Sequence, residues 1–281
     1  MHNKEQRTAG LELLLGQYTS PDTQRAYTGT VRAFERWLEA NEFEVCTAPT
    51  GLSYMHYCLH EREMAGSTWR RTQTLLKSFY TFLNETWPER FQTNPFKMKF
   101  TGKTTLGGSK EEMLVPLTKV ASIIAKAETD QERCILGLAF GCALRISEAL
   151  AITKEDVRFE PVRHVRLNET KAGVPQTVVI TDWAWKLIKP TWNATKPGQR
   201  LLPIGQDTLQ KSWKRCLVRA NVTGCTFHAG RATAITRLLA DGVDYHSVSR
   251  FARHASLAQT AQYDRRRLDL EGSAGLKLTY K

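Results

Sequence analysis

The sequence has 281 residues, of which 41% are hydrophobic and 24% charged, which is enough for one large or two ordinary domains with buried cores. The formal net charge of +12 favours a polyanionic partner, either nucleic acid or an anionic membrane surface. Most of the surplus lies in residues 109–281, which carry 27 basic and 17 acidic residues. No apolar run of about 18 residues occurs, which excludes a transmembrane helix.

Residues 1–93 predict a small unit of four helices. Ser20-Pro21 is typical of a helix start, with serine at the cap and proline in the first turn. The helix that follows has one apolar face at a spacing of 3.6 residues, formed by Tyr27, Val31, Phe34, Trp37 and Leu38. Further amphipathic stretches predict helices over 6–18, over 52–63 and from Gly66 onward.

Residues 94–110 are predicted as a linker, and residues 111–281 as a second domain with a C-terminal tail. Asn94-Pro95 breaks the helical pattern, and the stretch that follows is rich in glycine and lysine. Two short β-rich runs between Val162 and Ile180 flank a turn at 168–173 and indicate a β-hairpin. Helices are expected over 117–127, 130–142, from Arg145, and over 183–192, 207–219, 228–241 and 244–252. The expected fold class is therefore mostly α with a small β-hairpin (α+β).

The cysteines are scattered along the chain without a Cys-x-x-Cys pair, which argues against a zinc site and a disulfide framework. Reduced thiols in an intracellular protein are the simpler interpretation. The N-terminus also lacks the apolar core of a signal peptide. We therefore expect no metal and a cytoplasmic, DNA-associated location. The cysteines are Cys46, Cys58, Cys134, Cys142, Cys216 and Cys225.

Three short patterns in the second domain carry groups suited to chemistry. They are Arg145-Ile-Ser-Glu148 at a helix start, His228-Ala-Gly-Arg231 at the start of a later helix, and His254-Ala-Ser, with Tyr263 nine residues after the histidine. A lysine, Lys171, lies between the first two, at the predicted hairpin turn. Each pattern alone is weak, but their order and spacing together are specific.

Together these patterns resemble the tyrosine recombinase family, which is phage integrase-like and includes the Xer type. The resemblance covers nearly the whole chain, with residues 1–93 similar to the family's core-binding domain and the rest to its catalytic domain. It implies a 3′-phosphotyrosyl intermediate and needs no metal or other cofactor. The implied catalytic residues are Arg145, Lys171, His228, Arg231, His254 and Tyr263, supported by Glu148.

The residue types suit cleavage of a phosphodiester. Planar guanidinium groups of Arg145 and Arg231 match the non-bridging oxygens, on which negative charge grows during displacement. A tyrosine hydroxyl, with an ordinary pKa of about 10, needs a histidine and the arginine field to assist its deprotonation. The resemblance makes Lys171 the donor to the leaving 5′ oxygen and His254 a phosphate ligand. Glu148 would orient an arginine or histidine.

Plainer interpretations remain for several residues. Turn lysines are commonly just solvated, so this remains an alternative for Lys171, and a structural ion pair is an equal alternative for Glu148. Tyr245 and Tyr280 are rival nucleophiles, but the first precedes the histidine of the third pattern and the second lies in the tail.

Two residues depart from the family pattern. Arg253 precedes His254 where glycine is usual, and Gly230 precedes Arg231 where a larger apolar residue is common. Arg253 either crowds the turn or adds a phosphate contact, and the sequence leaves both open.

The predicted activity is site-specific recombination by a homotetramer on two double-stranded DNA sites, with a monomer or dimer in isolation. A type IB topoisomerase-like enzyme and a non-catalytic DNA-binding protein of the same fold remain alternatives, and a membrane-surface protein is a distant third. Phosphate contacts should supply most of the affinity for DNA. The basic residues on the helices from Ser20 and Ser67 are available for this, although solvated faces explain them equally well: Arg25, Arg32, Arg70, Arg71 and Lys77.

Overall fold

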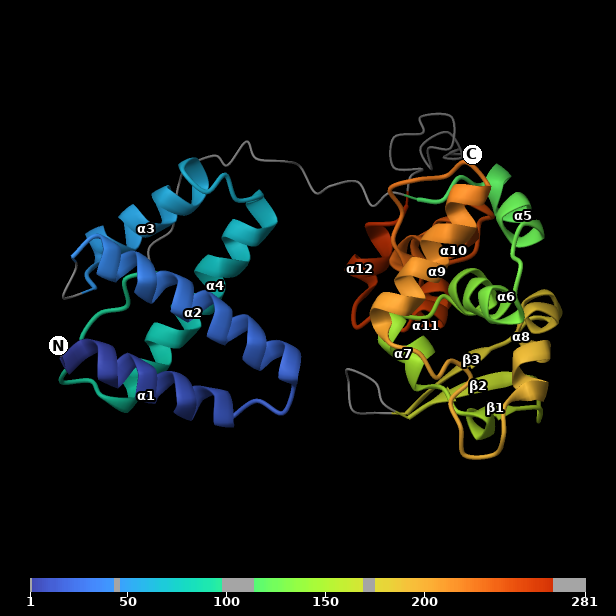
Figure 1. Ribbon diagram of the computed structural model, residues 1–281, viewed down its shortest axis with the longest axis horizontal. Helices are drawn as coiled ribbons and strands as arrows, with labels where there is room; N and C mark the ends of the chain where they lie inside the picture. Colours follow the sequence, from blue (N-terminus) through green and yellow to red (C-terminus); the bar gives the residue numbers. More distant parts are fainter. Residues whose placement is uncertain (1, 43–45, 98–113, 169–174, 265–281) are drawn as a thin grey trace, which may run out of the picture. The chain divides into compact units, whose positions relative to one another are not determined.

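The computed structural model describes residues 2–42, 46–97, 114–168 and 175–264, which belong to two compact units, Met1–Glu111 and Glu112–Lys281. Both units are mainly helical, and the second also contains a small three-stranded sheet (Figure 1). The predicted fold class, mostly α with a small sheet, is confirmed. Across these described ranges, no helix is both long and apolar enough to span a membrane.

The first unit contains the four predicted helices: α1 (His2–Gly16), α2 (Pro21–Ala40), α3 (Ala48–His60) and α4 (Gly66–Thr86). The third begins four residues earlier than expected because Thr47 caps it, its side chain accepting from the Thr50 backbone N–H. Aromatic side chains fill the core between the helices. The ring centroid of Phe34 lies 4.7 Å from that of Tyr54 and 5.2 Å from that of Phe96.

The start of the predicted linker 94–110 is corrected by this packing. Asn94 Nδ2 donates to the carbonyl oxygen of Lys77 at 2.7 Å and to Thr81 Oγ1 at 2.9 Å. Phe96 is fully buried in the aromatic core. Residues 94–97 therefore belong to the first unit, because Phe96 completes its core, and the rest of the predicted linker lies outside the described residues from 98 onward.

The second unit begins with α5 (Leu117–Ala125) and α6 (Asp130–Leu136), and α6 continues into a π-helical turn at Gly137–Gly141. The sheet has the order β1-β2-β3, and both pairs are antiparallel. The predicted hairpin is the pair β2 and β3, whereas β1 was not expected. The strands are β1 (Val157–Arg158), β2 (His164–Leu167) and β3 (Gln176–Val179), and the helices around them are α7 (Ile146–Ala151), α8 (Asp182–Ala194) and α9 (Gln206–Arg219).

Three helices complete the unit: α10 (Phe227–Ala240), α11 (Tyr245–Ala252) and α12 (Leu257–Ala261). The first two were predicted, as was the break at Gly242, which has the positive φ typical of a residue just after a helix. The short α12 was not predicted. The sheet lies at one edge of the unit, away from α10 (Figure 1).

Small residues let α10 approach the π-helical turn closely. A Cβ atom on Gly230 would lie 2.8 Å from both Ala139 Cβ and Trp213 Cη2, closer than real Cβ contacts allow. The larger apolar residue common in the family at this position would not fit here. Gly230 thus permits the approach that brings Arg231, the next residue, beside the backbone at Ala143.

A valine at position 230 tests this close approach. We expect Gly230→Val to lower the free energy of unfolding by about 1–3 kcal/mol, because the new side chain overfills a packed interface. Urea denaturation of the purified protein measures the change. Gly29→Val is the matched control, since Gly29 also lies inside a helix, α2, and has no atom within 4 Å of its added Cβ. Equal stability of the two variants would contradict the packing argument.

Candidate active site

Arg145 stands at the start of α7, where the chain leaves the buried π-helical turn. Its Nη1 donates to Glu148 Oε1 at 2.6 Å, and its backbone N–H donates to Glu148 Oε2 at 2.8 Å. Its Nη2 also donates to the backbone carbonyl of Arg253 at 3.2 Å. The side chain remains 35% exposed, whereas that of Glu148 is 5% exposed. The carboxylate therefore fixes a guanidinium group that still reaches solvent.

Arg231 projects from the first turns of α10 into the interior and is only 1% exposed. Its Nη1 donates to the Ala143 carbonyl at 2.6 Å, and its Nη2 donates to the Ala252 carbonyl. Burial, together with the charges of Arg145 and Arg253, lowers its pKa to about 10. The guanidinium group is still protonated at neutral pH.

Arg253 enters the same network from the end of α11. Its backbone is left-handed, with φ of 57°, a conformation that glycine adopts without strain. Its Nη2 donates to Glu148 Oε2 and to the Ala143 carbonyl, both at 2.9 Å, and its Nη1 donates to the Phe251 carbonyl at 2.8 Å. The sequence left two interpretations of Arg253 open, crowding of the turn and contact with a phosphate, and neither describes these contacts. The side chain instead pairs with groups inside the protein.

Among the described residues, the Glu148 carboxylate thus pairs with two guanidinium groups, those of Arg145 and Arg253, while a third, that of Arg231, donates to backbone carbonyls of the same cluster. Burial opposes ionisation of this carboxyl, but the charge of Arg253 and the hydrogen bonds from Arg145 outweigh it, so its pKa is lowered. The ionised carboxylate neutralises one of the three positive charges, which leaves the cluster with a surplus. Such a surplus in a partly desolvated place favours an anionic ligand.

His254 lies beside this cluster and is partly buried. Its Nδ1 is 2.9 Å from Thr260 Oγ1. Burial lowers its pKa to about 4, and the charges of Arg231, Arg145, Arg253 and His228 act in the same direction. The imidazole is therefore neutral at pH 7. His228 itself lies exposed in the first turn of α10.

Tyr263 follows α12, and its ring stacks on that of His254, with centroids 5.6 Å apart and planes inclined by 16°. Its backbone N–H donates to the Thr260 carbonyl at 3.0 Å. It packs against a small apolar cluster of α10 and α11. The rival Tyr245 belongs to the same cluster, and its hydroxyl donates to the carboxylate of Asp264, the residue next to Tyr263. Tyr245 is thus engaged as a support, and Tyr280 lies outside the described residues.

The structure therefore brings together Arg145, Glu148, Arg231, His254 and Tyr263. Lys171 lies outside the described residues, which end at Asn168 on this side of the hairpin. Sequence reasoning missed Thr260 and Asp264, and for Arg253 it offered only crowding of the turn or a phosphate contact. The arginine before His254 was the one visible signal, because it replaces a usual glycine.

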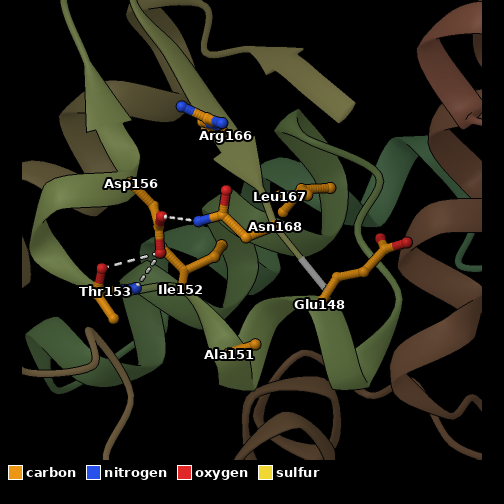
Figure 2. A pocket seen from close by; sticks show the side chains of 8 residues that line it. All are labelled: Glu148, Ala151, Ile152, Thr153, Asp156, Arg166, Leu167 and Asn168. Atoms are coloured by element: carbon orange, nitrogen blue, oxygen red, sulfur yellow. Dashed lines mark hydrogen bonds between the residues drawn. The ribbon is translucent and has the colours of Figure 1, made fainter. Parts of the chain in front are cut away.

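A small cavity of about 190 Å³ lies between α7, β2 and the 3-10 turn Lys154–Asp156. Figure 2 shows Asn168 directed toward Asp156, with Nδ2 2.7 Å from Oδ1. Asp156 also accepts from the backbone and hydroxyl of Thr153. Glu148 lines the cavity but points its carboxylate away from Asp156 (Figure 2). The cavity thus adjoins the arginine cluster through Glu148, and Asp156 holds Asn168, the residue that follows β2.

The predicted DNA-binding residues are all exposed, and they lie on two helices of the first unit. Arg25 and Arg32 line a groove along α2 together with Arg36, which sequence reasoning missed. Arg25 also pairs with Asp22. The remaining predicted residues lie on α4, with side chains outside the core: Arg70, Arg71 and Lys77.

Comparisons with known proteins agree with this arrangement. The family described as "Phage integrase family" matches residues 115–268, which is more than half of the chain. The domain family described as "Phage integrase, N-terminal SAM-like domain" matches residues 11–86. A protein of Chlamydia trachomatis, "Tyrosine recombinase XerC", is 28% identical over 70% of this chain and 66% of its own length, so the chain spans just under two thirds of that relative. The XerC of Listeria monocytogenes is 27% identical over 87% of each chain.

Among solved structures, a lambda integrase tetramer bound to a Holliday junction is similar to this chain. The TM-score is 0.73 at 14% sequence identity, and the match covers 94% of this chain and 78% of that chain. At this identity the similarity establishes the fold.

Acidification tests the low pKa of His254. The folded protein holds this pKa at about 4, below the ordinary value of 6.5, so the unfolded chain binds the proton first as the pH falls. We expect the melting temperature to fall between pH 6.5 and pH 4, and to fall less in His254→Gln. The exposed His246 offers a matched control, His246→Gln. If His254→Gln followed the wild-type curve through this window, the assigned pKa would be wrong.

Proposed function

The chain belongs to the phage integrase family, and on this premise we propose that it is a tyrosine-type site-specific recombinase that cuts and rejoins double-stranded DNA. The observation that carries the proposal is the cluster of three guanidinium groups, in which Arg145 and Arg253 pair with the Glu148 carboxylate and Arg231 shares the Ala143 carbonyl with Arg253. Its surplus positive charge suits a phosphodiester, and Arg145 remains exposed enough to reach one. Tyr263 stands beside this cluster, stacked on His254.

Arg145 and Arg231 would hold the non-bridging oxygens of the scissile phosphate and stabilise the charge that grows there. His254 is neutral, so it can donate to the phosphate from Nε2 when the Thr260 hydroxyl donates to Nδ1. Glu148 would hold Arg145 in place through its two hydrogen bonds.

The reaction would begin with attack of the Tyr263 hydroxyl oxygen on phosphorus. A bond from this oxygen to phosphorus forms, the bond from phosphorus to the 5′ oxygen breaks, and a 3′-phosphotyrosyl link remains. His228 would accept the tyrosine proton, and Lys171 would protonate the leaving 5′ oxygen. Attack of a 5′ hydroxyl from the partner strand then reverses these steps and rejoins the DNA, without a metal or other cofactor.

The first unit would bind the phosphates of the DNA backbone through the exposed basic residues of α2 and α4. Recombination joins two duplexes, so we propose a homotetramer on two DNA sites. The similarity to the fold of the lambda integrase tetramer on its junction supports this assembly. Such an enzyme would work in the cytoplasm, associated with DNA.

A covalent adduct is the direct test of the mechanism. The target site is first selected from random DNA fragments that the purified protein retains, and a nicked duplex with that site then traps the cleaved strand. We expect wild-type protein to become covalently attached and Tyr263→Phe to lose the adduct completely. Denaturing gel electrophoresis detects the adduct, and peptide mass spectrometry locates it.

Tyr245→Phe is the matched control, because it removes the hydroxyl of the rival tyrosine and should still yield an adduct at the end point. An adduct that survives in Tyr263→Phe would refute the assigned nucleophile. The absence of an adduct with wild-type protein that binds the selected site would favour the non-catalytic alternative.

The salt dependence of binding tests the groove along α2. Removing one arginine that binds a phosphate should reduce the slope of log K against log salt concentration by about one. We expect Arg32→Ala to weaken binding to all DNA sequences alike and to reduce the slope by about this amount. Arg90→Ala removes an exposed arginine outside the groove and should leave the slope unchanged. Identical slopes for both variants would remove Arg32 from the interface.

A further inference from the structure

We propose that Arg253 is a positioning residue that couples the two phosphate-binding arginines to each other. It does not contact the phosphate in this role but fixes the groups that hold Arg145 and Arg231. The inference rests on the proposed roles of those two arginines. It assigns a function to the arginine that replaces the usual glycine before His254.

The coupling follows from two shared acceptors. The Glu148 carboxylate accepts from Arg145 and from Arg253, on Oε1 and Oε2 respectively. The Ala143 carbonyl accepts from Arg231 at 2.6 Å and from Arg253 at 2.9 Å. One nitrogen, Arg253 Nη2, donates to both acceptors and so joins the two phosphate-binding arginines through a continuous chain of hydrogen bonds.

Burial makes this chain of hydrogen bonds rigid. The side chains of Arg253 and Glu148 are 2% and 5% exposed, so solvent cannot readily replace either partner. Without Arg253, the carboxylate would keep Arg145 as its partner in the cluster but would no longer be tethered to α11. The Ala143 carbonyl would keep only Arg231 of its two donors. The direction of this carbonyl sets the position of Arg231, so the arginine would be oriented less precisely. Both guanidinium groups would then be held less firmly.

The backbone shows that this arginine is held against a conformational cost. Arg253 has φ of 57° and ψ of 47°, which a side chain disfavours and glycine does not. Glycine at this position would therefore relieve the backbone while removing every side-chain contact. If Arg253 served folding alone, relieving the backbone and removing the side-chain contacts would both change only the free energy of unfolding. A positioning role predicts a slower chemical step.

The experiment compares Arg253→Gly and Arg253→Lys with wild type in single-turnover formation of the Tyr263 adduct on the selected, nicked site. Asn221→Gly is the matched control, because Asn221 is exposed, lies in the same unit and also has φ of 57°. Melting temperature and DNA affinity are measured for each protein. All rates are taken at a temperature at which every variant is folded.

We expect Arg253→Gly to form the adduct about tenfold to a hundredfold more slowly than wild type, because small misplacements of catalytic groups carry costs of this size. Its affinity for DNA should stay close to that of wild type. Arg253→Lys keeps the charge but lacks the forked donors, so its rate should fall between the two. Asn221→Gly should react like wild type.

A neutral phosphate separates positioning from a general defect. Replacing one non-bridging oxygen at the scissile position by a methyl group removes the charge on which the two arginines act. The rate difference between wild type and Arg253→Gly should then shrink to about threefold or less. A loss of folded or active protein would instead reduce the rates on both substrates equally.

Three outcomes would overturn the inference. The first is an unchanged rate in Arg253→Gly while wild type forms the Tyr263 adduct, which leaves the proposed function intact. The second is an equal rate loss on charged and neutral phosphate, which makes Arg253 a structural residue. The third is a wild type that binds the site and forms no adduct, which refutes the proposed function and the inference together.

Discussion

The ion pairs of the Glu148 carboxylate with Arg145 and Arg253 constrain the rest of the active site. Buried charges are tolerated when they are paired, and removing one partner leaves the other uncompensated. Here one carboxylate pairs with two of the three guanidinium groups in the described part of the cluster, so the pairing of charges is incomplete. The guanidinium group of Arg231 therefore donates to backbone carbonyls, and the surplus positive charge favours binding of an anion. The site is electrostatically prepared for a phosphate before DNA binds.

The backbone around this cluster is shaped to supply those carbonyls. Ala143 and Arg253 both have positive φ, of 46° and 57°, and they lie at the ends of the two segments that face Arg231. The Ala143 turn follows the π-helical turn, a form of helix that is frequent at functional sites. Gly230 lets α10 approach that turn. Local strain and small residues thus place the acceptors that orient the arginines.

The long helices and the hairpin were predictable because apolar residues recur there at regular spacing, as in α2. The two residues of β1 and the five of α12 are too few to show a period. Phe96 was assigned to a linker because its partners lie in other helices. The order of the motifs predicted which residues gather at the site, and their catalytic roles stay proposals. The pairing of Arg253 with Glu148, 105 residues away, was not predictable, because a single sequence shows neither a positive φ at an arginine nor a distant partner.

The arginine field also determines the state of His254, and this links the histidine to the substrate. Burial and the positive charges of the cluster keep its pKa at about 4, so in the proposed mechanism it would meet the phosphate as a neutral donor. A bound phosphate brings negative charge into the same field and opposes the effect of the arginines. Binding must therefore raise the pKa of His254, and by reciprocity protonation of His254 must strengthen phosphate binding. In the proposed mechanism, the imidazole of His254 thus binds a proton more readily once the phosphate is in place.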